Sequence, residues 1–131
     1  MAQVRFKPKG EKMGRMQRSK GARGERELAR ELVRVLGVDA GSIYRSVQHC
    51  GREGAGDVLG VAGVHIESKR TESLSVYKAM EQALDDCGRD IPIVCHKRNL
   101  QQWLVICELR DLVKLSRAIV AIVGTESEPH R

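Results

Sequence analysis

Apolar residues along the chain change from the spacing of a helix to the spacing of strands. Across residues 19–37 they recur every three or four positions, which predicts a helix that ends at Gly37. Residues 42–48 (SIYRSVQ) have the composition of a strand, and residues 56–70 (GDVLGVAGVHIESKR) predict a β-hairpin. The first half of the chain is therefore expected to hold one helix and three strands.

The second half repeats this change of spacing. Tyr77, Met80, Leu84 and Cys87 mark one face of a further helix. The pattern predicts that this helix, two strands and a closing helix occupy residues 73–88, 91–97, 103–109 and 109–120. The order of the elements predicts an α/β domain with a mixed central sheet.

Charge and composition divide the chain into three parts. Residues 1–20 carry seven basic residues and one acid, interrupted by Gly and Pro, which predicts a flexible basic arm suited to phosphate contacts. Residues 21–123 are expected to form a single domain. Residues 124–131 (GTESEPHR) are expected to form a disordered tail.

The net charge of +6 and the isoelectric point near 9.4 favour a polyanionic partner. Nucleic acid comes first, because no predicted helix joins a broad apolar face to the basic face that a membrane surface would attract. Aromatic residues make up only 3% of the chain, so base stacking is not expected to dominate binding. The longest apolar run, residues 118–123, is too short to cross a bilayer, and no signal peptide is visible. We therefore expect a soluble, cytoplasmic protein.

The cysteines form no CxxC pair and have no zinc-finger spacing; they are Cys50, Cys87, Cys95 and Cys107. Most of them lie in or beside apolar runs, where a free cysteine behaves as a small hydrophobic residue. We expect reduced thiols and no small-molecule cofactor, with a zinc ligand pair at His49 and Cys50 as the lesser alternative.

The hairpin of residues 56–70 places two carboxylates and a lysine close together. Side chains alternate along a strand, so Glu67 and Lys69 are expected to share one face. A three-residue loop that ends at Gly63 places Asp57 opposite Glu67, whereas a two-residue turn places it on the other face. Facing carboxylates repel each other unless they share a proton or a cation, and hard oxygen ligands suit Mg²⁺ or Mn²⁺. The alternative is an exposed hairpin face with a salt bridge between Glu67 and Lys69.

Two further charged residues bear on this site. Glu25 lies on the apolar side of the first predicted helix and is expected to face the sheet, whereas Glu27 and Glu31 are expected to turn outward and pair with neighbouring arginines. Arg45, on the strand before the hairpin, suits a bidentate phosphate contact. The simpler alternatives are a helix-terminal charge for Glu25 and a surface charge for Arg45.

Four segments follow one another between residues 20 and 69: KGARGERELARELVRVLG, YRS, GDV and IESK. In this order they resemble the archaeal-type Holliday junction resolvases of the PD-(D/E)XK nuclease superfamily, and the similarity covers roughly residues 19–107. The resemblance implies a restriction-endonuclease-like fold, in which helices flank a mixed sheet with a core of helix, three strands, helix and strand. Gly56 stands where the name of the superfamily has proline.

The resemblance also implies roles for individual residues. The catalytic residues of that family match Glu25, Asp57, Glu67 and Lys69, the three acids as ligands of Mg²⁺ or Mn²⁺ and the lysine beside the attacking water. The family's phosphate-binding basic residues match Lys20, Arg26 and Arg45. We extend the predicted DNA-binding set to three further basic residues, which are Arg23, Arg52 and Arg70.

The sequence thus predicts a Mg²⁺-dependent endodeoxyribonuclease that hydrolyses phosphodiester bonds in branched DNA, such as a four-way junction. Symmetric cutting of a junction needs two active sites, so a homodimer is implied. Two alternatives stay open. One is a nuclease of the same chemistry with flap, nicking or restriction-like specificity, and the other is a non-catalytic basic DNA-binding module.

Overall fold

A computed structural model describes residues 6–46 and 56–123 of the chain, with side chains from residue 21 onward. The elements follow the predicted order of helix, three strands, helix, two strands and helix. Their bounds are α1 Phe6–Leu36, β1 Tyr44–Arg45, β2 Val58–Leu59, β3 Val64–Arg70, α2 Val76–Asp86, β4 Ile91–Lys97, β5 Leu104–Cys107, η3 Leu109–Asp111 and α3 Leu112–Val123.

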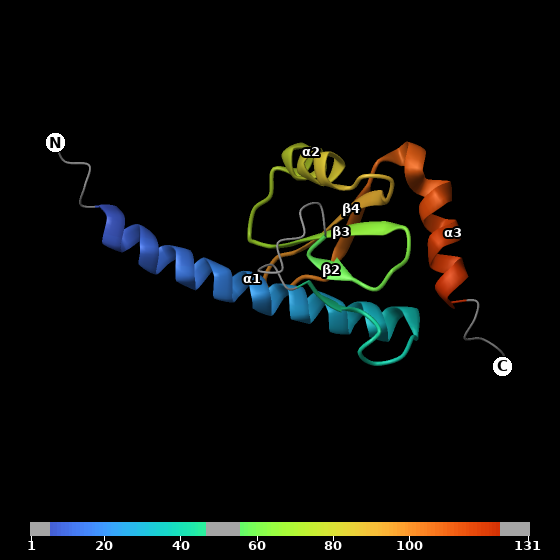
Figure 1. Cartoon of the computed structure of the whole chain (residues 1–131), viewed down its shortest axis with the longest axis horizontal. Coiled ribbons are helices and arrows are strands. Elements are labelled where there is room, and N and C mark those ends of the chain that lie inside the picture. The colour runs from blue at the N-terminus through green and yellow to red at the C-terminus, as the bar shows by residue number, and fades with distance from the viewer. Residues whose placement is uncertain (1–5, 47–55, 124–131) are drawn as a thin grey trace.

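The five strands form one sheet in the order β1-β2-β3-β4-β5. β3 and β4 run parallel, with α2 as the crossover between them, and the other neighbouring strands are antiparallel. Figure 1 shows α2 on one side of the sheet and α1 on the other, with α3 at the end of the molecule away from the N-terminus. The prediction of an α/β domain whose mixed central sheet is flanked by helices is confirmed.

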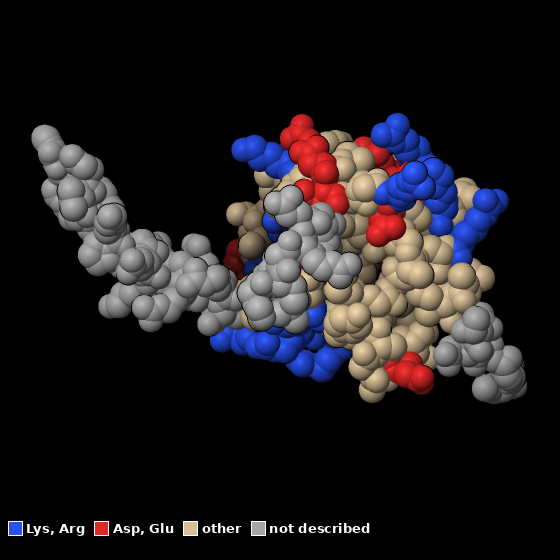
Figure 2. Space-filling view, in the orientation of Figure 1, with Lys and Arg blue, Asp and Glu red and all other residues tan. Residues whose placement is uncertain are grey.

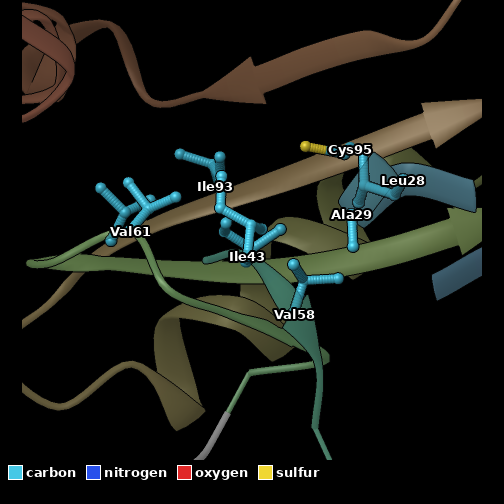
Figure 3. Packing of buried hydrophobic residues seen from close by; sticks show 9 residues of the cluster. Leu28, Ala29, Ile43, Val58, Val61, Ile93 and Cys95 are labelled. Carbon is cyan, nitrogen blue, oxygen red and sulfur yellow. The ribbon is translucent and has the colours of Figure 1, made fainter. Parts of the chain in front are cut away.

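The larger core lies between α1 and the sheet. Leu28 and Ala29 of α1 pack with Val58 of β2 and with Ile93 and Cys95 of β4. Figure 3 shows these side chains together with others of the same cluster. Their burial fixes which face of β2 and β4 is turned toward α1, and therefore which side chains point the other way.

The smaller core lies on the opposite face, under α2. Ala79, Met80 and Ala83 pack there against Val94, which points away from α1 because side chains alternate along β4. Tyr77 was expected on this buried face, but it is 89% exposed. Met80, which the sequence placed on the same face, is buried as expected, and Ala79 and Ala83 complete the buried face.

The described cysteines are free thiols, as the sequence predicts. Cys95 is fully buried, and burial raises the pKa of its thiol to about 12, so it is a small hydrophobic residue of the core. Cys87 and Cys107 are half-buried. Cys50 and His49 lie outside the described residues.

The largest difference from the expected secondary structure is at the start of the chain. α1 begins at Phe6 and runs through most of the segment that we expected to be a flexible arm. Lys, Arg, Met and Gln are favourable helix residues, and Pro8 lies in the first turn, where proline is tolerated. The expected disordered tail, residues 124–131, lies outside the described residues. Within the part of the chain that the structure describes, no helix is both long enough and apolar enough to span a membrane.

Replacing Leu28 by Ala is expected to lower the free energy of unfolding by about 3 kcal/mol, because the side chain is 1% exposed and its removal leaves a cavity between α1 and the sheet. Val35→Ala, in the same helix but 62% exposed, is the matched control and is expected to change it by less than about 0.5 kcal/mol. Urea denaturation followed by circular dichroism measures both. Equal effects of the two variants would mean that α1 is not docked through Leu28.

Candidate active site

The register of β2 and β3 is the one expected from a three-residue loop, but the turn that closes the hairpin is a hydrogen-bonded four-residue turn, residues 61–64, with Ala62 and Gly63 at its centre. Val58 is paired with Ile66, the backbone N–H of Val64 donates to the carbonyl of Val61 at 3.1 Å, and Gly63 has a φ of +81°. A positive φ is the conformation that glycine adopts without strain, which is why this loop closes at Gly63. The ladder does not continue regularly past Val58, because the N–H of Asp57 donates to the carbonyl of Ile66, the partner of Val58, yet the carboxyl groups of Asp57 and Glu67 lie within hydrogen-bonding reach of each other.

Asp57 is held in place by β3 itself. Its backbone N–H donates to the carbonyl oxygen of Ile66 at 2.8 Å, and its Oδ2 accepts from the backbone N–H of Ser68 at 2.8 Å. Gly56, just before it, is buried against the same strand: a Cβ there would lie 2.8 Å from the oxygen and 2.9 Å from the nitrogen of Ile66. The approach of the two backbones thus needs a residue without a side chain, which accounts for glycine at this position.

Burial raises the pKa of Asp57 to about 7, and the negative charge of Glu67 acts in the same direction. The hydrogen bond from Ser68 opposes the shift, while Glu25 and a hydrogen bond shared with Glu67 add to it. Near neutral pH the Asp57 carboxyl group is therefore protonated part of the time, because a second negative charge beside Glu67 is unfavourable at this poorly solvated position. A divalent cation would remove that repulsion as well as a proton does.

The second carboxylate of the pair, Glu67, has a partner that was not predicted from the sequence. His65 Nε2 lies 2.7 Å from Glu67 Oε2, with the side chains 2% and 7% exposed. This hydrogen bond raises the pKa of His65. The two residues are two apart on β3, and that spacing, which puts them on one face, is the signal from which the contact could have been predicted.

Glu25 faces the sheet, as predicted, but it is paired with a cation. Arg45 Nε donates to Glu25 Oε1 at 3.1 Å, and the glutamate side chain is 13% exposed. Burial raises the pKa of Glu25, and the hydrogen bond and charge of Arg45 oppose that shift. Arg45, predicted as a phosphate ligand, thus joins β1 to α1 in this structure.

Lys69 shares the α2 side of the sheet with Glu67 but is turned toward the helix. Its Nζ donates to Oε1 of Gln82, on α2, at 3.2 Å. The alternative from the sequence, a salt bridge between Glu67 and Lys69, is not formed, and Glu67 is buried rather than exposed. Lys69 lies two residues from Glu67 along β3, but its amine is bound by Gln82.

The predicted DNA-binding residues fall into three groups. Arg23 and Arg26 are exposed on α1. Arg70 is engaged within the protein: its Nε donates to Glu27 at 3.1 Å, and Lys97 Nζ lies 3.8 Å from the same carboxylate. We expected Glu27 to turn outward; it instead bridges α1 to β3 and β4. The side chain of Lys20, and Arg52 as a whole, lie outside the described parts of the structure.

The exposed side of α1 carries more arginines than the two that were predicted from the sequence to bind DNA there. Figure 2 shows basic side chains gathered over this helix, below the body of the molecule. The exposed arginines follow one another at three- and four-residue intervals, so they lie along one stripe; they are Arg23, Arg26, Arg30 and Arg34. Arg34 pairs with Glu31, as expected of that glutamate. We call these four residues the α1 stripe.

Among the residues that the structure describes, no group of three or more His, Cys, Asp and Glu side chains is arranged to hold a metal ion. Asp57 and Glu67 supply a facing pair of hard oxygen donors, while the third predicted ligand, Glu25, is tied to Arg45. The donor chemistry suits Mg²⁺ or Mn²⁺, with water completing the shell.

Comparison of the chain with protein-family models, with curated proteins and with solved structures gives no match.

Proposed function

We propose that the chain is a metal-dependent DNA endonuclease. The observation that carries the proposal is the half-buried carboxylate of Asp57 beside the buried carboxylate of Glu67, where burial and the neighbouring charge raise the pKa of Asp57 to about 7 in a chain of net charge +6. A paired, half-buried carboxylate whose pKa reaches neutrality is unfavourable for folding, and such groups cluster at functional sites. The resemblance to PD-(D/E)XK nucleases, and with it a restriction-endonuclease-like fold, belongs to the same proposal.

Asp57 and Glu67 would hold the cation directly, and Glu25 through a water molecule. The bound cation would polarise the scissile phosphate and lower the pKa of an attacking water. His65 holds the Glu67 carboxylate in a fixed orientation, as an outer partner of a metal ligand does. Lys69 would leave Gln82 and orient the water against the phosphorus, and its charge would offset the negative charge that develops there.

The DNA backbone would lie along the α1 stripe. Arg34 follows Arg23 by 11 positions of helix, a rise of about 16 Å, which is comparable to the reach of several phosphates along one strand. Contacts of this kind position DNA without reading its sequence. They fit an enzyme that selects its substrate by shape, and a branched molecule such as a four-way junction is the substrate that the resemblance implies. Cutting such a junction on both sides would need a homodimer.

The proposal is tested by incubating the purified protein with a labelled four-way junction and with a linear duplex of the same arm sequence, with Mg²⁺, with Mn²⁺ and with EDTA. We expect the junction to be cut in either metal and not in EDTA. Glu67→Gln is expected to lose cutting by roughly 10³-fold while it still binds the junction. Glu81→Gln, an exposed acid on α2, is the matched control and is expected to cut normally.

One pair of contacts favours a second candidate, a DNA-binding module without catalysis. Lys69 and Glu25 are both engaged by other side chains, Gln82 and Arg45, rather than by the carboxylate pair. Such a module would bind DNA with a strong dependence on salt and would cut under no divalent metal. Binding without cutting in the experiment above therefore rejects the enzyme and retains the module.

A further inference from the structure

The turn between β4 and β5 holds an apolar residue in an unfavourable position. Leu100 is 98% exposed and has a φ of +64°. The backbone N–H of Gln101 donates to the carbonyl of Arg98 at 3.2 Å, so Leu100 is the third residue of a hydrogen-bonded four-residue turn. A positive φ at that position is normally supplied by Gly or Asn. Leucine here costs conformational strain and buries nothing in return.

The base of the turn is firmly anchored although its tip is exposed. The backbone N–H of Asn99 donates to Glu72 Oε2 at 2.7 Å, and Asn99 Oδ1 accepts from Arg70 Nη1 at 3.1 Å. Arg70 is in turn fixed by Glu27 of α1. The backbone that carries the Leu100 side chain is therefore held in a fixed position.

The turn lies at the end of the sheet that carries the candidate site. β3 and β4 are parallel, with Lys69 paired to His96 and Arg70 paired to Lys97. Leu100 follows Lys97 by three residues, which is a span of about 10 Å at most. An extended ligand at Glu67 and Lys69 would therefore come within reach of the turn.

The neighbours of Leu100 in the chain are polar and exposed: Arg98, Asn99, Gln101 and Gln102. Leu100 is the one apolar side chain of this turn, and the next exposed apolar residues, Leu104 and Val105, lie on β5. A single apolar side chain at the tip of a turn is a poor docking surface for another protein, which would need a wider apolar area. It is a suitable wedge for DNA, because leucine can enter an opened base step while the polar neighbours contact the phosphates.

We propose that Leu100 is a wedge that packs against an unstacked base at the branch point of the DNA. The inference rests on the proposed function, and it names the feature of the substrate that the protein would recognise. Strain at an exposed leucine would then be retained because the side chain serves the complex rather than the fold. A branch point offers such a base at low cost, since its stacking is already interrupted, whereas a continuous duplex does not.

The test replaces Leu100 by Gly and, separately, by Asn, the two residues that a positive φ favours. Both variants are expected to melt at the same temperature as the parent protein or at a higher one, since they remove strain. Their affinity for a four-way junction is expected to fall about tenfold, with the affinity for linear duplex unchanged. A fluorescent adenine analogue at the branch point is expected to brighten with the parent protein and not with either variant.

Leu109→Ala, which alters another exposed leucine, is the matched control and is expected to leave both readings as they are. If the parent protein prefers the junction and brightens the analogue and the variants at position 100 do the same, the wedge is rejected while the proposed function stands. If the parent protein cuts the junction without brightening the analogue, the wedge is again rejected alone. If it neither prefers nor cuts the junction, both proposals fail.

Discussion

Asp57→Asn is expected to stabilise the metal-free protein at pH 8 and to abolish its Mg²⁺-dependent cutting. The amide keeps the shape of the carboxyl group and can still accept from Ser68, but it carries no charge beside Glu67. It therefore removes the charge that burial and the neighbouring Glu67 disfavour, which are the two largest causes of the raised pKa of Asp57. The same substitution removes an anionic oxygen donor, so cutting is expected to fall by roughly 10³-fold or more.

The sign of the pH dependence follows from the folded and unfolded states of Asp57. Its pKa is about 7 in the folded protein against the ordinary value of 3.8 for an aspartate in an unfolded chain, so the folded state binds the extra proton. Stability from this group is fully present below pH 3.8 and is lost as the pH rises through 7. Asn stays neutral throughout, so the gain in free energy of unfolding should grow from near zero at pH 4 to at most about 4 kcal/mol at pH 8.

Urea denaturation in EDTA at several pH values measures this gain. Asp85→Asn, which neutralises an exposed acid on α2, is the control and should show no such growth with pH. His65 and Glu25 also have raised pKa values, and each loses stability in the same direction as the pH rises. Both are present in parent and variant, so a difference between the two proteins isolates Asp57. A variant that is less stable than its parent at pH 8 would show that the Asp57 carboxylate serves the fold.

The parts of the fold that the sequence predicts are those that depend on neighbouring residues in the chain. The hairpin and the pairing of Val58 with Ile66 follow from the sequence, and the carboxyl groups of Asp57 and Glu67 meet there, although the turn at Ala62 and Gly63 and the bond from Asp57 to Ile66 depart from the regular ladder that the sequence predicts. The order of the elements follows from the same local periodicities. That Asp57 and Glu67 lie close together could therefore be predicted from the sequence.

The contacts that were missed depend on how the elements cross. Arg45 meets Glu25 because β1 lies beside α1, and Lys69 meets Gln82 because α2 covers β3. No spacing along the chain encodes either contact. Leu100 is a different case. Leucine is not a typical turn residue, so its positive φ, and the strain that follows from it, cannot be predicted before the backbone is known.

Gly56→Ala is expected to damage the fold and the site together. The new Cβ would lie within 2.9 Å of two backbone atoms of Ile66, and backbone in a paired strand cannot turn aside as a flexible side chain can. β2 must separate from β3, which we expect to cost about 3 kcal/mol of unfolding free energy. Asp57 would move with it, and a displacement of about 1 Å from Glu67 is expected to slow cutting on the order of 100-fold.

The matched control for Gly56→Ala is Gly21→Ala, in α1, where a Cβ would meet nothing within 4 Å. Alanine is the better helix residue, so this variant is expected to be more stable than the parent by about 1 kcal/mol and to cut normally. Urea denaturation and the junction assay, run on both variants, separate a local backbone clash from a general effect of adding a methyl group. A Gly56→Ala protein with the stability and cutting rate of its parent would mean that the hairpin can hold Asp57 beside Glu67 without the close backbone approach at Ile66.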